Sequence, residues 1–128
     1  MLSQPVLLGL TLCERVIFEE ETKNVTLVSG FQGLRVDAFP SSPQRISVFA
    51  VLTEGEGDVS MELVAHRLDT LDEIYNQQVR VAFPDRLTEV RVHFRLTQLV
   101  FPVPGFYQFS LIIGSSSELA QRRLRVYS

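Results

Sequence analysis

A single stretch in the second half of the chain restricts the possible folds more than any other. Between Thr88 and Thr97, every second residue is apolar, and the residues between them are charged or polar. Successive side chains of a β-strand point to opposite faces, so this period of two gives one dry and one wet face. In a helix the same apolar residues would be scattered around the axis. The stretch therefore predicts a half-buried strand, which needs a second layer to cover its dry face.

Similar patterns and turn residues continue along the chain. Residues 58–68 also alternate, and residues 46–52 are apolar on both faces, as is typical of a covered central strand. The charged residues 19–24 predict a hairpin loop, and Gly30 and Gly33 predict a bulge or a tight corner. Further strands are expected at 74–83, 106–113 and 118–127. We expect an all-β fold, a single antiparallel two-sheet β-sandwich of about eight strands with immunoglobulin-like or C2-like topology, as one domain over residues 1–128.

Composition limits the class of protein. With 128 residues, 45% of them hydrophobic and 21% charged, the chain can bury the core of one domain. The net charge of -3 gives no argument for nucleic acid or membrane binding, and no apolar run reaches the eighteen or so residues of a membrane span. Cys13 is the only cysteine, and no Lys or Arg precedes the apolar residues 6–12 as a signal peptide requires. These features predict a cytoplasmic protein.

Two stretches carry a family resemblance. The first is Leu12-Cys13-Glu14 with the later Leu27-Val28-Ser29-Gly30-Phe31, and the second is Pro104-Gly105-Phe106-Tyr107-Gln108-Phe109 with the closing Arg123-Leu124-Arg125-Val126. Together they resemble a family of small bacterial proteins whose shared region is known only as a domain of unknown function. The resemblance implies a β-sandwich and a bacterial source, and it implies no activity and no site residues.

Catalytic and cofactor motifs are missing from the sequence. It has no nucleophile elbow of the Gly-x-Ser-x-Gly kind, and its Gly30-x-x-Gly33 spacing does not open a helix as a phosphate loop does. The outward-facing His66 and His93 have no further ligands at metal spacing. We therefore expect a non-catalytic protein without a cofactor, and an enzyme of unrecognised type is the remaining alternative.

One loop end forms an alternative ligand site. Glu54, Glu56 and Asp58 have the one-residue spacing that lets carboxylates converge on calcium, and Asp85 falls at the same end in an up-and-down topology. A ligand- or calcium-binding sandwich using residues 54–58 and 85 is the second hypothesis. A small-molecule ligand thus stays open.

The leading hypothesis is a protein-binding or assembly module that acts through a sheet face or an edge strand. Some apolar residues alternate with core residues, and they need either cover from loops or a subunit interface: Phe49, Val51, Phe106 and Ile112. Two further sets present arginine on a strand face: Arg91, His93 and Arg95, and Arg123, Arg125 and Tyr127. If these two faces adjoin, they form one arginine stripe for an acidic protein partner. Nine of the 15 acidic residues lie in residues 1–64 and eight of the 12 basic residues in 65–128, which favours self-association as well.

Overall fold

The computed structural model of the chain describes residues 4–114 and 117–128. These residues form nine β-strands and no helix, and hence contain no helix that could cross a membrane. In chain order the strands are β1 (Val6–Phe18), β2 (Val25–Gly30), β3 (Gly33–Arg35), β4 (Gln44–Thr53), β5 (Gly57–Arg67), β6 (Glu73–Phe83), β7 (Val90–Leu99), β8 (Gly105–Ile113) and β9 (Ser117–Tyr127).

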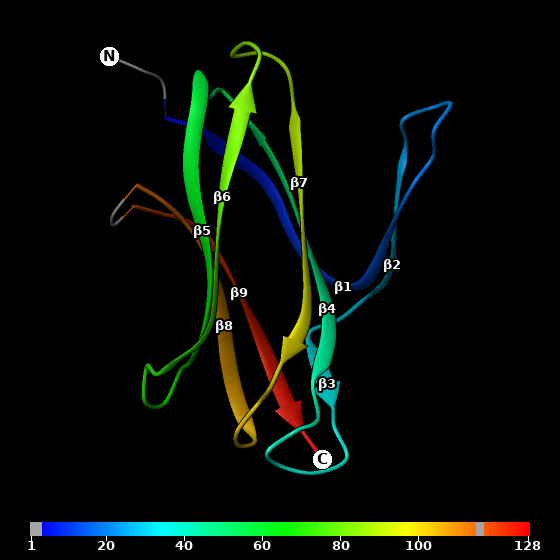
Figure 1. Cartoon of the computed structure of the whole chain (residues 1–128), viewed down its shortest axis with the longest axis vertical. Coiled ribbons are helices and arrows are strands. Elements are labelled where there is room, and N and C mark those ends of the chain that lie inside the picture. Colours follow the sequence, from blue (N-terminus) through cyan, green and yellow to red (C-terminus); the bar gives the residue numbers. More distant parts are fainter. Residues whose placement is uncertain (1–3, 115–116) are drawn as a thin grey trace.

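The strands form two sheets whose apolar sides pack together (Figure 1). Sheet A has the order β2-β1-β4-β7, and sheet B has the order β3-β9-β8-β5-β6. The predicted all-β two-sheet fold is confirmed.

The nine strands of the described residues agree with the expected number of about eight. One detail of the prediction is wrong, because β3 runs parallel to β9 and makes sheet B mixed rather than antiparallel. The reason is the corner between Gly30 and Gly33. It takes the chain from the end of β2 in sheet A across to sheet B, where β3 arrives beside β9 in the same direction. A strand of three residues is too short to alternate visibly in the sequence.

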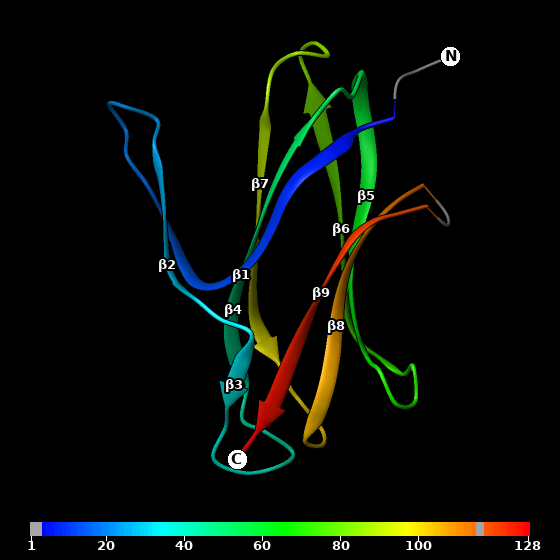
Figure 2. The ribbon, with the colours of Figure 1, turned by 180° about the vertical axis from the view of Figure 1, so that it is seen from behind.

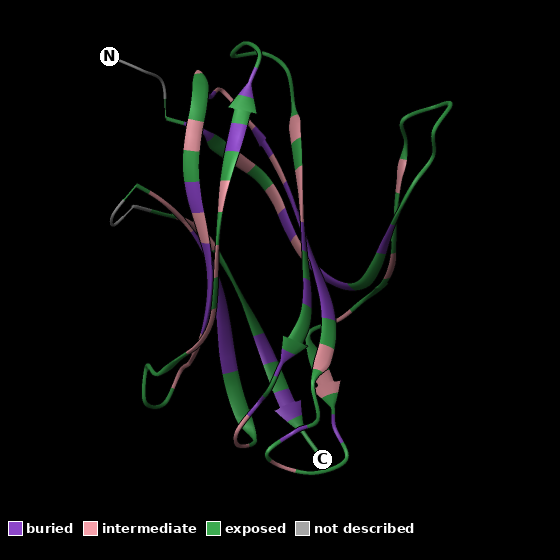
Figure 3. Ribbon diagram, in the orientation of Figure 1, coloured by how far each residue is buried: buried purple, intermediate pink, exposed green. Residues whose placement is uncertain are grey.

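The core lies between the sheets and contains the residues that the alternation predicted. Phe94 and Leu96 of β7 are each 1% exposed, and they face buried residues of sheet B such as Leu63 and Phe109. Figure 3 shows buried positions along the strands and exposed positions on the hairpin turns and loops. Burial of these large side chains is the main stabilising contribution to the fold.

The closing segment before β8 is held by Tyr107. Its hydroxyl donates a hydrogen bond to the carbonyl of Val103 (2.6 Å), and its ring contacts that of Phe101 edge to face at 4.9 Å. Both rings are fully buried. Since a buried hydroxyl needs a partner, this bond fixes the loop against the core.

A bulge alters β7 near its end. Gln44 pairs with Leu99 and Ile46 with Leu96, so Thr97 and Gln98 both lie opposite Arg45. Because of this extra residue, the alternation of inward and outward side chains shifts by one position, so Leu96 and Leu99 are both buried. The predicted strand ended at Thr97 because the alternation stops there, whereas the strand continues to Leu99.

The β1–β2 hairpin folds back over the outer face of sheet A. At the start of the hairpin Cys13 pairs with Gly30, and Ser29 beside it has a left-handed backbone (φ 55°). Beyond this point the hairpin forms an arm that leaves the body of the sandwich (Figure 2). A second buried cluster joins β1 to β4, and it consists of Cys13, Val16 and Phe49. Burial raises the pKa of the Cys13 thiol. The hairpin thus acts as a partial third layer.

Candidate functional site

Two strand edges are free on one side of the sandwich. β1 pairs with β4 from Val6 to Cys13, but it pairs with β2 only from Cys13 onward. β9 pairs with β3 only from Arg125 to Tyr127. Within the described residues, the first half of β1 and most of β9 therefore have no strand on this side. Figure 2 looks onto it, with β1 in blue and β9 in orange to red.

A few contacts bridge these two edges. Arg122 extends from β9 and its Nε donates a hydrogen bond to the carbonyl of Leu10 in β1 (2.8 Å). Nearby, the amide of Phe31 donates to the carbonyl of Leu12 (3.1 Å), and that of Arg125 donates to Gln32 (3.0 Å). These bonds hold the link between β2 and β3 in place and leave the middle of β9 uncovered.

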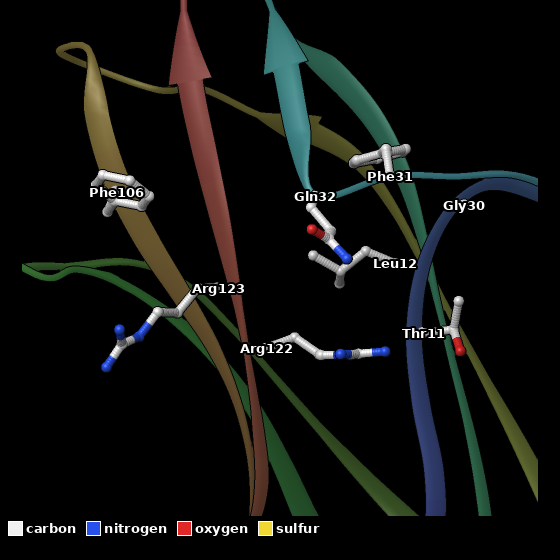
Figure 4. Close-up of a pocket in the computed structure, with 8 residues that line it drawn as sticks. All are labelled: Thr11, Leu12, Gly30, Phe31, Gln32, Phe106, Arg122 and Arg123. Atoms are coloured by element: carbon white, nitrogen blue, oxygen red, sulfur yellow. The ribbon is translucent and has the colours of Figure 1, made fainter.

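A groove of about 710 Å³ lies over this side. In Figure 4, Arg122 points from β9 toward β1, whereas Arg123 and Phe106 lie on the opposite side of β9. The groove, which we call the β9 groove, is lined by Thr11, Leu12, Gly30, Phe31, Gln32, Phe106, Arg122 and Arg123.

The backbone of β9 offers hydrogen-bonding groups to this groove. The amide of Arg125 points toward β3, because it bonds to Gln32. In a strand, every second residue directs its N–H and C=O to the same side, so Arg123 and Gln121 direct theirs to the free edge. A bulge where β9 meets β8, at Leu119, limits the regular free edge to about residues 120–124.

Sheet B brings several predicted partner-surface residues together. Phe106 is 55% exposed and pairs across the strands with Arg125, whose guanidinium lies 5.5 Å from the centre of the Tyr127 ring. Arg123 lies two residues before Arg125 on the same outer face of β9, where it pairs with Gln108. Ile112 is half-buried near the far end of β8. Phe106 and the three β9 residues thus form one patch beside the β9 groove.

The condition for a single arginine stripe, that the two strand faces adjoin, is not met. Arg91, His93 and Arg95 lie on β7 in sheet A, while Arg123, Arg125 and Tyr127 lie on β9 in sheet B. Alternation along each strand identified the outward positions correctly, but it contains no information on which sheet a strand joins. The two sets therefore line two separate surfaces.

Phe49 and Val51 are covered by the same chain. Phe49 is only 6% exposed, and the ring of Phe18 in the hairpin lies 6.4 Å from its own. Val51 packs against the same cluster. Of the two alternatives that the sequence left open for these residues, the structure shows cover from within the chain.

A second groove, of about 440 Å³, lies between the hairpin and the outer face of sheet A. It contains His93, whose Nε2 is hydrogen bonded to the hydroxyl of the buried Ser47 (2.9 Å). Burial, and secondly the charge of Arg95, lower the pKa of His93 below its usual 6.5. Arg15 and Arg45 also line this groove.

The loop end with the acidic residues is largely paired within the protein. A guanidinium nitrogen of Arg86 lies 3.5 Å from a carboxylate oxygen of Glu54, and another lies 3.7 Å from a carboxylate oxygen of Glu56. The carboxylate of Asp85 accepts hydrogen bonds from the amides of Leu87 and Thr88, and the bonds to Thr88 are the main cause of its lowered pKa. The loops do meet at one end, as expected. In the part of the chain that the structure describes, no three His, Cys, Asp or Glu residues are grouped to hold a metal.

Sequence reasoning missed the groove residues Arg15, Arg45 and Arg122 as site residues. The sequence pattern could have identified Arg122, because it lies two and four residues before the buried Leu124 and Val126 and so takes a core-facing position in the alternation. A charged residue at a core-facing position of a strand indicates that the strand is open at that point. Arg15 and Arg45 gave no such signal, because the sequence does not show that Arg45 of β4 lies beside β7 or that the hairpin brings Arg15 to the same groove.

Comparison with known proteins supports the fold and supplies a family. Crystal structures of a beta-glucosidase from Listeria innocua, alone and in complex with isofagomine, are similar to 98% of this chain with a TM-score of 0.53 and 10% sequence identity. The chain spans 16% of the length of that enzyme, and at this identity the likeness concerns the fold alone. No curated protein matches the sequence. The model of a family of unknown function, DUF6941, matches residues 8–127, and the chain belongs to this family.

Proposed function

We propose that this domain is a non-catalytic protein-binding module that takes up an extended segment of a partner protein as an additional strand beside β9. The observation that carries the proposal is the free edge of β9 in the 710 Å³ β9 groove. In strand addition, main-chain hydrogen bonds supply affinity and alternate side chains supply specificity. Residues 120–124 would pair with a segment of similar length, about 16 Å at 3.3 Å per residue.

The side chains beside this edge indicate the chemistry of the segment. Arg123 and Phe106 lie on the outer face, one cationic and one apolar, at diagonal positions on β9 and β8. A partner strand with an acidic side chain and an apolar side chain on that face would match both. On the other face, Arg122 already bonds to Leu10, so small or polar side chains fit there.

A proline at the free edge tests the proposal. In Gln121→Pro the ring replaces an amide that points to the free edge, so the variant keeps the β8–β9 ladder but cannot donate to an added strand. Gln121→Ala keeps the amide and serves as the matched control. Heptapeptides are selected from a phage-displayed library on the immobilised wild-type domain, and their affinities for all three proteins are measured by fluorescence anisotropy.

We expect selected peptides to bind wild type and Gln121→Ala equally and to bind Gln121→Pro at least about tenfold more weakly, which corresponds to about 1.4 kcal/mol. Amide hydrogen exchange should slow at residues 121 and 123 when peptide is bound. The proposal is wrong if the selection yields no binder, or if the binders are indifferent to Gln121→Pro while circular dichroism shows that this variant is folded.

A further inference from the structure

The groove between the hairpin and the outer face of sheet A has a composition unlike the rest of the surface. Arg15 reaches it from the hairpin, Arg45 from β4 and Arg95 from β7. Its floor is the hydrogen-bonded pair of His93 and Ser47. We call it the arginine groove and define it by these five residues. It lies on the outer face of sheet A, and it shares no lining residue with the β9 groove between the edges of β1 and β9.

Three strands converge to build it. Ser47 of β4 pairs with Cys13 of β1 on one side and with Arg95 of β7 on the other. Arg45 lies two residues from Ser47 on the same strand, opposite the β7 bulge. Because neighbouring strands are about 4.8 Å apart, the three strands place their side chains within the reach of one small ligand.

The positive charge of the arginine groove is not neutralised within the described residues. There, the ion pairs of arginine with carboxylates involve Arg67 and Arg86 and none of the three groove arginines. Glu14 is the one acidic residue among those lining the groove. By contrast, Arg91 on the same strand face is engaged, since its Nη1 donates to the carbonyl of Lys23 at the hairpin turn.

The floor adds polar groups that are held in place. Ser47 is 6% exposed, and the ring of Phe18 lies 6.0 Å from that of His93. His93 is thus positioned by a hydrogen bond on one side and by the hairpin on the other. The neighbours of His93 are the guanidinium of Arg95 on its own strand, the hydroxyl of Ser47 on β4 and the ring of Phe18 in the hairpin. The other charged residues that line the groove are Arg15, Arg45 and Glu14.

We propose that the arginine groove binds a phosphate group. Three guanidinium groups offer more donors than the two oxygens of a carboxylate accept, and they match the three terminal oxygens of a phosphate monoester. The hydroxyl of Ser47 and the imidazole of His93 supply further donors at the floor. The phosphate belongs either to a small molecule or to a phosphorylated side chain of a protein.

The test uses nuclear magnetic resonance of the intact domain. Inorganic phosphate is titrated at pH 7, with sodium chloride adjusted to keep the ionic strength constant, while the ring protons of both histidines are followed. A phosphoserine-containing pentapeptide forms the second arm and its unphosphorylated form the control. Arg45→Gln and Arg95→Gln remove groove donors, and Arg80→Gln, at an exposed position of β6 in sheet B, is the matched control outside the groove.

We expect a saturable shift of the His93 signal and a rise in the pKa of His93, because a bound dianion favours the imidazolium. The His66 signal, from sheet B, should not change. Each groove variant should weaken binding by about tenfold, as for the loss of one charge-assisted hydrogen bond, and Arg80→Gln should bind as wild type does. Comparable binding of both probes identifies a small-molecule phosphate, and binding of the phosphopeptide alone identifies a protein-borne one. The proposal is overturned if neither probe gives a saturable shift, or if Arg80→Gln weakens binding as much as the groove variants do.

Discussion

Replacing Phe49 by alanine tests whether the hairpin covers the outer face of sheet A. The sequence assigned Phe49 and Phe106 the same role, as apolar residues facing away from the core. The structure separates them, since Phe49 is 6% exposed and Phe106 is 55% exposed. Truncating a buried phenylalanine costs about 3–5 kcal/mol of unfolding free energy. We expect about 3 kcal/mol for Phe49→Ala, because the hairpin can settle partly into the space.

Phe106→Ala is the matched control. Half of its ring is already in water, so the substitution should cost less than about 1 kcal/mol. Urea unfolding followed by circular dichroism measures both variants. For a domain of this size, the loss in Phe49→Ala corresponds to a fall in melting temperature of about 10 °C. Equal destabilisation by the two substitutions would refute the claim that the hairpin buries Phe49.

A double-mutant cycle with Phe18 assigns the effect to the hairpin itself. The two rings lie 6.4 Å apart with an interplanar angle of 57°, within the range of favourable aromatic pairs. Such pairs couple by about 0.5–1.5 kcal/mol, so Phe18→Ala should cost less in the Phe49→Ala background than in wild type. Additive costs would mean that the hairpin does not rest on Phe49 in solution.

Three further predictions concern the core, the floor of the arginine groove and the closing segment. A methyl group at Gly55 would lie 2.5 Å from the buried ring of Phe83, so Gly55→Ala should lose about 1–3 kcal/mol in urea unfolding. Because the pKa of His93 is lowered by folding, the unfolded chain binds the proton more readily. Stability should therefore fall as the pH drops below about 6.5 and level off below the folded pKa, and His93→Gln should remove this part of the pH dependence of the melting temperature. Tyr107→Phe leaves the carbonyl of Val103 without its donor and should cost about 1–3 kcal/mol by the same urea assay.

Local alternation was sufficient to predict the strands and the core. Phe94, Leu96 and Tyr107 are buried where the period of two placed them, and the strand Val6–Phe18 ends where the predicted hairpin loop of residues 19–24 begins. These features depend on neighbours in the chain, because the direction of a side chain in a strand is fixed by its position in the repeat. A turn rich in charged residues is likewise a local signal.

The surfaces could not be predicted in the same way, because they depend on contacts between distant segments. The sequence showed that Phe49 needed a cover, but part of that cover is the ring of Phe18, more than thirty positions earlier in the chain. The separation of Arg95 from Arg123 depends on which sheet each strand enters. The free edge of β9 depends on the shortness of β3, whose three residues leave no pattern. Each feature is a matter of topology, which a periodicity along one strand does not determine.

Both proposed sites arise from the bend in β1 at Cys13. This residue pairs with Ser47 of β4 and with Gly30 of β2, and beyond it β1 no longer pairs with β4. Because β2 joins β1 only there, the earlier half of β1 keeps a free edge facing β9. Because the diverted hairpin then covers sheet A, Arg15 is carried to Arg45 and Arg95. The bend therefore positions the strands that form both sites, whereas the side chains of Gln121 and the groove arginines lie at the protein surface. Substitutions at those positions can thus test the binding chemistry without changing the fold that creates it.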